Sequence, residues 1–131
     1  MKYILIPFIA WITSGCFKFT VNFLRFGFTK AKALIGYGHF PSTHTTIIST
    51  AVFFIGFTEG FKTPLFSLGL SVLLIVIIDA HGLRREIEKH SIILNKLQKE
   101  LTARERMGHS WLEISGGLLT GFALSYLLTC V

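Results

Sequence analysis

A histidine and a glutamate towards the end of the sequence stand at a spacing that suits catalysis. His109 and Glu113 are four residues apart, so they would share one face of a helix. A histidine can attack phosphorus as a nucleophile, and a second histidine can protonate the leaving group. A carboxylate beside a histidine fixes its tautomer and supports its developing charge, as in a catalytic triad. Glu113 is therefore placed to orient His109 in this way.

Other ionisable residues stand next to apolar stretches, where charge is costly and needs an explanation. Arginine and lysine bind phosphate oxygens through their charge and their several hydrogen-bond donors. Besides the first pair, the groups are Lys18 with Arg25, His39 with His44, and Asp79 with His81, Arg84 and Arg85. Such a set of cations, histidines and carboxylates suits the binding and transfer of a phosphoryl group.

Four apolar segments would have to position these residues. A spanning helix needs about 20 mostly apolar residues. The candidate spans run from Tyr3 to about Leu24, from about Thr43 to Phe61, from Pro64 to about Gly82 and from Trp111 to Val131. The short connection from Gly60 to Pro64 predicts an antiparallel hairpin. In the last span, the spacing of Gly116, Gly117 and Gly121 suits close helix packing in a membrane.

Lysine and arginine are unequally distributed between the two sides of such a bundle. The loop from Arg25 to Phe40 carries Arg25, Lys30 and Lys32 and no acid, and residues 84–106 carry seven basic residues and four acids. The positive-inside rule predicts that both loops are cytoplasmic and that both termini lie outside. All four ionisable groups then fall on the cytoplasmic face, which we predict to carry the site.

The segment from Glu86 to Arg106 is too charged to span a membrane. Ile87, Leu94, Leu97 and Leu101 recur in it at helical spacing. We expect an amphipathic helix that lies on the membrane surface or covers the site, with packing against a partner subunit as the alternative.

The composition indicates one membrane-embedded domain over residues 1–131. Hydrophobic residues make up 51%, charged residues 15%, and the mean hydropathy is +0.60, which leaves too little polar surface for a soluble domain. The formal charge is +6, and the basic residues lie between apolar runs. This placement favours a role in membrane topology or in binding anionic lipid over a role in binding nucleic acid. We expect Cys16 and Cys130 to be buried free thiols, and the first apolar run to be a retained helix.

The ordered motifs resemble those of type 2 phosphatidic acid phosphatases and vanadium haloperoxidases. Residues 38–44, Gly-His-Phe-Pro-Ser-Thr-His, are similar to their Pro-Ser-Gly-His motif. Lys18 and Arg25 match their first motif, with Phe26 in place of its proline, and His109 with Glu113 resembles the final His-x-x-x-Asp. Residues 79–85 and 108–113 look still more like a compact bacterial and plastid branch, the divergent type 2 phosphatidic acid phosphatase family.

This resemblance implies a role for each candidate residue. His109 would form a phosphohistidine intermediate, oriented by Glu113, and His44 would protonate the departing group. The residues implied to bind the phosphoryl oxygens are Lys18, Arg25, Ser42 with nearby backbone amides, and Arg84 or Arg85. Asp79 would support them, and the mechanism needs neither a metal nor another cofactor.

Simpler explanations and other functions stay open. Ser42 could only cap a helix, and Asp79 could form a structural ion pair with Arg84 or Arg85. A non-catalytic protein could bind anionic lipid headgroups with the same cations, and it would tolerate replacement of both candidate histidines. A small transporter-like oligomer would carry charge in mid-span, whereas these charges lie at span ends. A metal site built from His39, His44, His81 and His109 has no spacing signature.

We therefore expect an all-α integral membrane bundle of about four spanning helices and one amphipathic surface helix, in a bacterial inner membrane or an organelle membrane. The expected activity is hydrolysis of a phosphate ester or pyrophosphate on a lipid or polyprenyl carrier. Candidate substrates are phosphatidate, phosphatidylglycerophosphate and polyprenyl pyrophosphate. The partners would be that substrate and membrane lipids rather than nucleic acid, and so small a bundle could form a homodimer.

Overall fold

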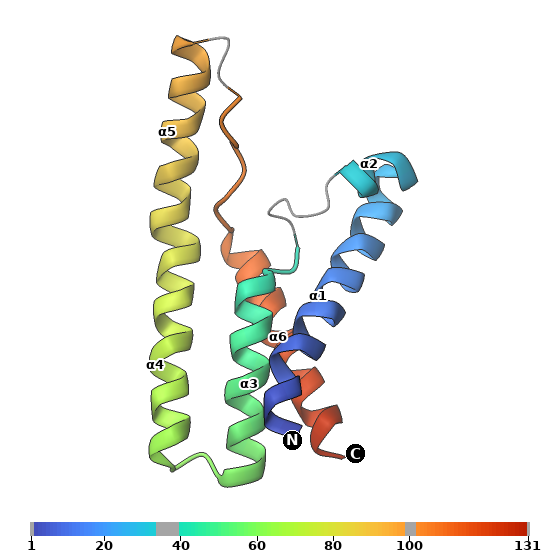
Figure 1. Ribbon diagram of the computed structural model, residues 1–131, viewed down its shortest axis with the longest axis vertical. Coiled ribbons are helices and arrows are strands. Elements are labelled where there is room, and N and C mark those ends of the chain that lie inside the picture. Colours follow the sequence, from blue (N-terminus) through green and yellow to red (C-terminus); the bar gives the residue numbers. More distant parts are fainter. Residues whose placement is uncertain (1, 34–39, 99–101, 131) are drawn as a thin grey trace.

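Helices dominate this chain in the computed structural model, which describes residues 2–33, 40–98 and 102–130. The elements are α1 (Lys2–Phe26), α2 (Phe28–Ala33), α3 (Thr43–Glu59), α4 (Pro64–Ile78), a π-helical turn η1 (Asp79–Leu83), α5 (Arg84–Leu97) and α6 (Trp111–Thr129) (Figure 1). No strand occurs within these described ranges. The all-α fold that the sequence predicts is therefore confirmed.

Large apolar side chains cover the outside of the bundle, and small polar side chains fill much of its interior. Among the described residues, ten buried side chains are polar or charged and nine are hydrophobic, whereas Ile4, Leu68 and Leu119 are each more than 60% exposed. This distribution suits a protein that has hydrocarbon as its solvent. Cys16 and Cys130 are free, as expected, but they lie on the outer surface and not in the interior.

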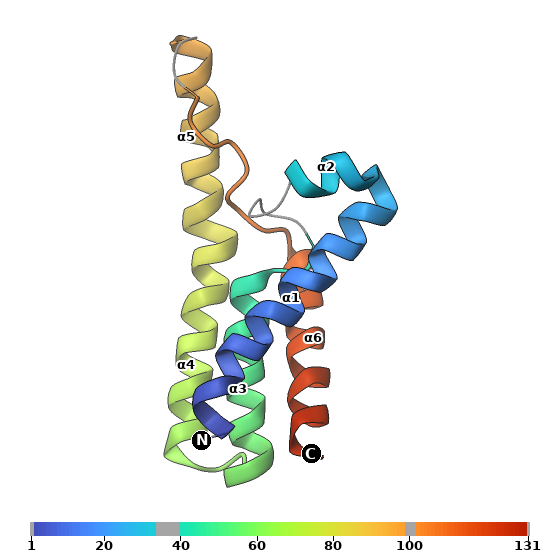
Figure 2. The same cartoon turned by 45° about the vertical axis from the view of Figure 1, so that its right-hand side comes forward.

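Among the residues that the structure describes, three helices are long and apolar enough to cross a membrane, namely Tyr3–Phe26, Pro64–Leu97 and Trp111–Thr129. The fourth expected span corresponds to α3, whose 17 residues reach about 25 Å against a hydrocarbon core of about 30 Å. α3 contacts α1, α4 and α6 and so lies at the centre of the bundle (Figures 1 and 2).

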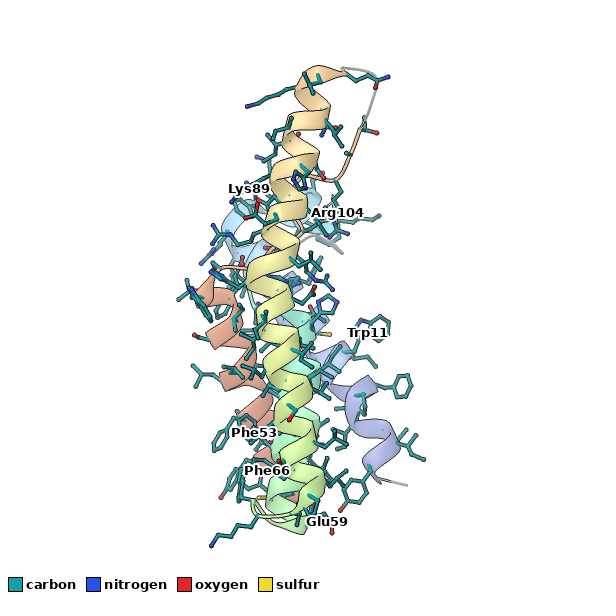
Figure 3. The ribbon with its side chains drawn as sticks, turned by 90° about the vertical axis from the view of Figure 1, so that its left-hand side faces the viewer. Trp11, Phe53, Glu59, Phe66, Lys89 and Arg104 are labelled. Carbon is teal, nitrogen blue, oxygen red and sulfur yellow. The ribbon has the colours of Figure 1, made fainter. Side chains whose placement is uncertain are left out.

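The expected antiparallel hairpin joins α3 to α4. Gly60 ends α3 with a φ of 105°, a conformation that favours glycine, and its N–H donates to Gly56 O at 3.1 Å. Thr63 is the N-cap of α4, and its Oγ1 accepts a hydrogen bond from Phe66 N at 3.2 Å. Figure 3 shows Glu59 at this end of the molecule, with Lys89 and Arg104 towards the opposite end.

α3 and α6 approach each other closely because small residues line their contact. A Cβ at Gly117 would stand 2.8 Å from Ser42 O, and a Cβ at Gly121 would overlap Ser49 Oγ and stand 2.9 Å from Thr50 N. Ser49 Oγ also donates across the contact to Gly117 O at 3.3 Å. The glycines therefore serve close packing, as expected, and they bring the starts of α3 and α6 together.

The third apolar segment continues further than expected. α4, η1 and α5 form one helix of 34 residues, Pro64–Leu97, which is about 51 Å long and exceeds a hydrocarbon core of about 30 Å. The sequence predicts an amphipathic helix over residues 86–106, either on the membrane surface or covering the site. The observed helix ends at Leu97 and continues in line with α4 (Figure 1). Residues 84–97 contain no glycine or proline, so nothing in them stops the helix.

Candidate functional site

The residues before α6 form a helix cap that also holds His109. Ser110 N donates to Glu113 Oε2 at 2.8 Å, and Ser110 Oγ accepts a hydrogen bond from Glu113 N at 3.3 Å. This reciprocal capping box satisfies main-chain donors at the helix start. His109 Nδ1 lies 3.3 Å from the same Oε2. One carboxylate oxygen therefore fixes the start of α6 and orients the imidazole.

The π-helical turn holds His109 from a second direction. His109 is only 4% exposed, and its main-chain N donates to Ala80 O at 2.9 Å. His81 Nδ1 lies 3.3 Å from His109 O, and the His81 ring packs on Trp111 with 4.3 Å between the ring centroids. Since Nδ1 of His109 faces Glu113, Nε2 is the nitrogen left to carry a reacting group.

The same turn places Asp79 opposite Arg84. Arg84 Nε donates to Asp79 Oδ2 at 2.5 Å, and each side chain is about one third exposed. Of the two partners considered for Asp79, the structure therefore selects Arg84. π-helical turns inside α-helices are frequent at functional sites. The charges of Asp79 and Arg84 act on His44 at the start of α3.

His44, the second residue of α3, lies within the electrostatic field of this group. Its side chain is exposed, and the charges that act on it are those of Arg84, His109, Lys18 and Asp79. The structure thus brings His44 near His109, although 65 residues separate them in the sequence. A role for His44 as proton donor stays a prediction.

Lys18 joins the group from α1. Ser14, one helical turn earlier, donates from its Oγ to Thr43 Oγ1 at 3.2 Å, which ties this face of α1 to the start of α3. The charges of Glu113 and Arg104 act on Lys18. The group at one end of the bundle therefore combines Lys18 of α1, His44 of α3, Asp79 of η1, Arg84 of α5 and the His109–Glu113 pair at the start of α6.

Two other candidate phosphate ligands are placed differently. Ser42 is fully buried as the N-cap of α3, where its Oγ accepts hydrogen bonds from Thr45 N at 3.4 Å and Thr45 Oγ1 at 2.9 Å. Its own N donates to Glu113 O at 2.9 Å, which links the starts of α3 and α6. Arg25 is exposed in the last turn of α1, where α1 has tilted away from α3 (Figure 2). A phosphate contact by either residue stays a prediction.

An open cavity of about 240 Å³ lies beside His109. Its lining residues are Arg85, Glu88, Arg106, Gly108, His109, Ser110 and Glu113. Two guanidinium groups and an imidazole suit an anion with several oxygens. The two carboxylates are engaged in the local fold, since Glu113 accepts hydrogen bonds at the helix cap and Glu88 accepts them from the main chain before His109.

A sequence model of the family described as "Divergent PAP2 family" matches residues 1–124, nearly the whole chain. The chain belongs to the divergent PAP2 family. It is also similar to the uncharacterized membrane protein YuiD of Bacillus subtilis (strain 168), with 24% identity over 111 residues that cover 70% of each protein. No solved structure matches it. This chain is therefore an integral membrane protein related to the PAP2 enzymes.

In this divergent PAP2 protein, two residues that line the cavity were not identified from the sequence motifs. Arg106 reaches the cavity because residues 102–110 return from α5 towards α6, and Glu88 reaches it from α5. The short distance in sequence between Arg106 and His109 was the only signal for the first, and Glu88 carried none. Within the described ranges, no three histidine, cysteine, aspartate or glutamate side chains gather to hold a metal ion. His39 lies outside the described residues.

Proposed function

We propose that this divergent PAP2 protein is a membrane phosphatase that hydrolyses a phosphate ester or pyrophosphate of a lipid or polyprenyl carrier. One observation carries the proposal, namely that the buried His109 is bonded to Glu113 beside a cavity with two arginines. A helix cap alone needs Ser110 and Glu113 but no buried histidine. A headgroup-binding site alone needs the cations but no oriented imidazole.

In the first step, His109 Nε2 would attack the phosphorus atom of the bound headgroup. A bond forms between nitrogen and phosphorus, and the bond between phosphorus and the leaving oxygen breaks. His44 would give its proton to that oxygen, so that an alcohol or a phosphate departs. Glu113 would stabilise the positive charge that develops on the imidazole, because its Oε2 faces Nδ1 at 3.3 Å.

In the second step, water would hydrolyse the phosphohistidine. His44, now neutral, takes a proton from the attacking water, whose oxygen forms a bond to phosphorus as the nitrogen–phosphorus bond breaks. Inorganic phosphate leaves and both histidines return to their starting states. His109 therefore carries the phosphoryl group and His44 carries the proton, and the enzyme is unchanged at the end of the cycle.

The cations around His109 would bind the phosphoryl oxygens in both steps. Arg85 and Arg106 line the cavity, and Lys18 and Arg84 approach from the side of His44. Their positive charge favours the transition state, in which negative charge spreads over the phosphoryl oxygens. Trp111 and Leu112 are exposed and apolar at the start of α6, so the tails of a lipid substrate could stay in the bilayer beside the site.

Phosphate release from a panel of lipid phosphates tests the proposal. We would compare the wild type with His109→Ala in detergent, with a chelator present, and use His90→Ala as the matched control because His90 is exposed on α5. We expect release by the wild type and the control and none by His109→Ala. Absence of release from every lipid would favour headgroup binding or transport instead. Equal release by His109→Ala would exclude His109 as the nucleophile.

A further inference from the structure

The segment that leads to His109 lies along α5 and is held there by side chains of that helix (Figure 1). Asn95 pairs with the main chain of Ala103 in both directions: its Nδ2 donates to Ala103 O at 2.8 Å, and its Oδ1 accepts from Ala103 N at 2.9 Å. Its Nδ2 also donates to Glu105 Oε1 at 2.8 Å. The side-chain amide of asparagine offers both a donor and an acceptor. It can therefore pair with a main-chain N–H and C=O, as the main chain of a neighbouring strand would.

Glu88 holds the same segment two turns nearer to the site. Its Oε2 accepts hydrogen bonds from Met107 N at 3.3 Å and from Gly108 N at 3.1 Å. These are the two main-chain N–H groups that immediately precede His109. Hydrogen bonds to a charged carboxylate are stronger than those between neutral groups.

Packing between these two contacts shows that the segment covers one face of α5. Glu88, Ser91 and Asn95 share this face by helical spacing, and Ser91 is the buried residue of α5, with 7% exposed. At the near end, a Cβ on Gly108 would stand 3.0 Å from the Cα and N of Arg85. The main chain just before His109 therefore has little freedom to shift while Glu88 holds it.

We propose that Glu88 is a positioning residue for His109, with Asn95 as a second hold on the same segment. The inference rests on the proposed function, because it assigns Glu88 the task of placing the nucleophile. Loss of the carboxylate frees Met107 N and Gly108 N, and His109 and Arg106 can then move relative to the cavity. A displacement of about 1 Å in a reacting group can lower a rate about 100-fold.

Hydrogen exchange tests the hold of Glu88 without any need for activity. We would compare amide exchange over residues 102–110 in the wild type, Glu88→Ala and Glu88→Gln, with Glu86→Ala as the matched control. Glu86 is exposed on the same helix and pairs with Lys89 at 2.6 Å. We expect exchange about tenfold faster in Glu88→Ala, little change in Glu88→Gln, whose amide oxygen still accepts both bonds, and none in the control.

Kinetics then test whether the hold positions the nucleophile. We expect Glu88→Ala to lower kcat about 100-fold with little change in KM, and Glu88→Gln to recover most of the rate. Unchanged exchange in Glu88→Ala, or faster exchange over the whole bundle, would overturn the inference, as would altered exchange with an unchanged kcat.

If the wild type releases no phosphate, the proposed function fails, while the exchange experiment still decides whether Glu88 orders His109. If Glu88→Ala does not fold, Asn95→Ala is measured in its place, with the same result expected over residues 102–105.

Discussion

At the scale of single residues, the carboxylate of Glu113 has two partners, which require different properties of it. The main-chain N of Ser110 needs only an acceptor, which any side-chain carbonyl oxygen provides. The imidazole of His109 needs a negative charge once it becomes positive during phosphoryl transfer. A substitution that keeps the acceptor and removes the charge therefore separates the two roles.

We expect Glu113→Gln to keep the helix cap and to lower kcat by about 100-fold or more, since the charge beside His109 is lost. Glu113→Ala should lose both, with the same fall in rate and about 1 kcal/mol less stability. Phosphate release and thermal unfolding in detergent measure the two effects. A wild-type rate in Glu113→Gln would reduce Glu113 to a helix cap.

Ser42 allows a similar separation of capping from phosphate binding. Its Oγ is buried and accepts hydrogen bonds from Thr45, so Ser42→Ala should cost about 1 kcal/mol of stability and leave KM nearly unchanged. Thermal unfolding and steady-state kinetics check the two statements. A KM raised more than tenfold at unchanged stability would return Ser42 to the phosphate ligands.

At the scale of helices, the contact of α3 with α6 decides whether the site assembles. The histidines sit at the starts of these two helices, and Ser42 N bonds to Glu113 O at 2.9 Å between them. Their spacing is set by glycines, because hydrocarbon offers no hydrophobic force to press helices together and close packing must do so.

Gly121→Ala should therefore destabilise the bundle by about 1–3 kcal/mol, since its Cβ would overlap Ser49 Oγ and stand 2.9 Å from Thr50 N. Gly15→Ala is the matched control in α1, where a Cβ meets nothing within 4 Å. Thermal unfolding of both variants in detergent compares them. Equal midpoints would show that α3 and α6 can separate without loss.

The helix formed by α4, η1 and α5 has a different function in the fold. By continuing past the bundle it provides a straight support, along which residues 102–108 return to His109 (Figure 1). A helix lying flat on the membrane would leave those residues without Glu88 and Asn95 as partners. The continuity of this helix is thus the reason that Arg106 reaches the cavity.

At the scale of the whole molecule, both ends of the described chain lie at the end of the bundle opposite the site (Figures 1 and 2). The positive-inside rule predicts that the site end faces the cytoplasm, because Lys30 and Lys32 belong to a basic loop without acids. A phosphatase of this orientation would act on headgroups of the cytoplasmic leaflet.

Cysteine labelling from each side of the membrane tests this orientation. In a chain with Cys16 and Cys130 replaced, we expect Lys30→Cys to react only from the cytoplasmic side and Lys62→Cys only from the other. Both lysines are exposed, at opposite ends of the bundle. The reverse pattern would place the site outside and would change the leaflet from which it takes its substrate.

Much of this protein follows from the order of its residues alone. Membrane helices, the turn at Gly60 and the pairing of His109 with Glu113 each depend on residues close in the chain, so hydropathy and spacing predict them. The small residues of α6 predicted a close contact, although not that α3 would be its partner.

Other contacts that hold the site residues in place follow only from the tertiary structure. Glu88 and Asn95 bind main-chain groups, which every residue carries, so the sequence of the returning segment holds no mark of them. The choice of Arg84 for Asp79 likewise depends on the π-helical turn, and the bond from Ser42 N to Glu113 O depends on the distance between α3 and α6. The bonds of Glu88 to Gly108 and of Ser42 to Glu113 join different elements of the fold, and their geometry exists only once those elements have packed.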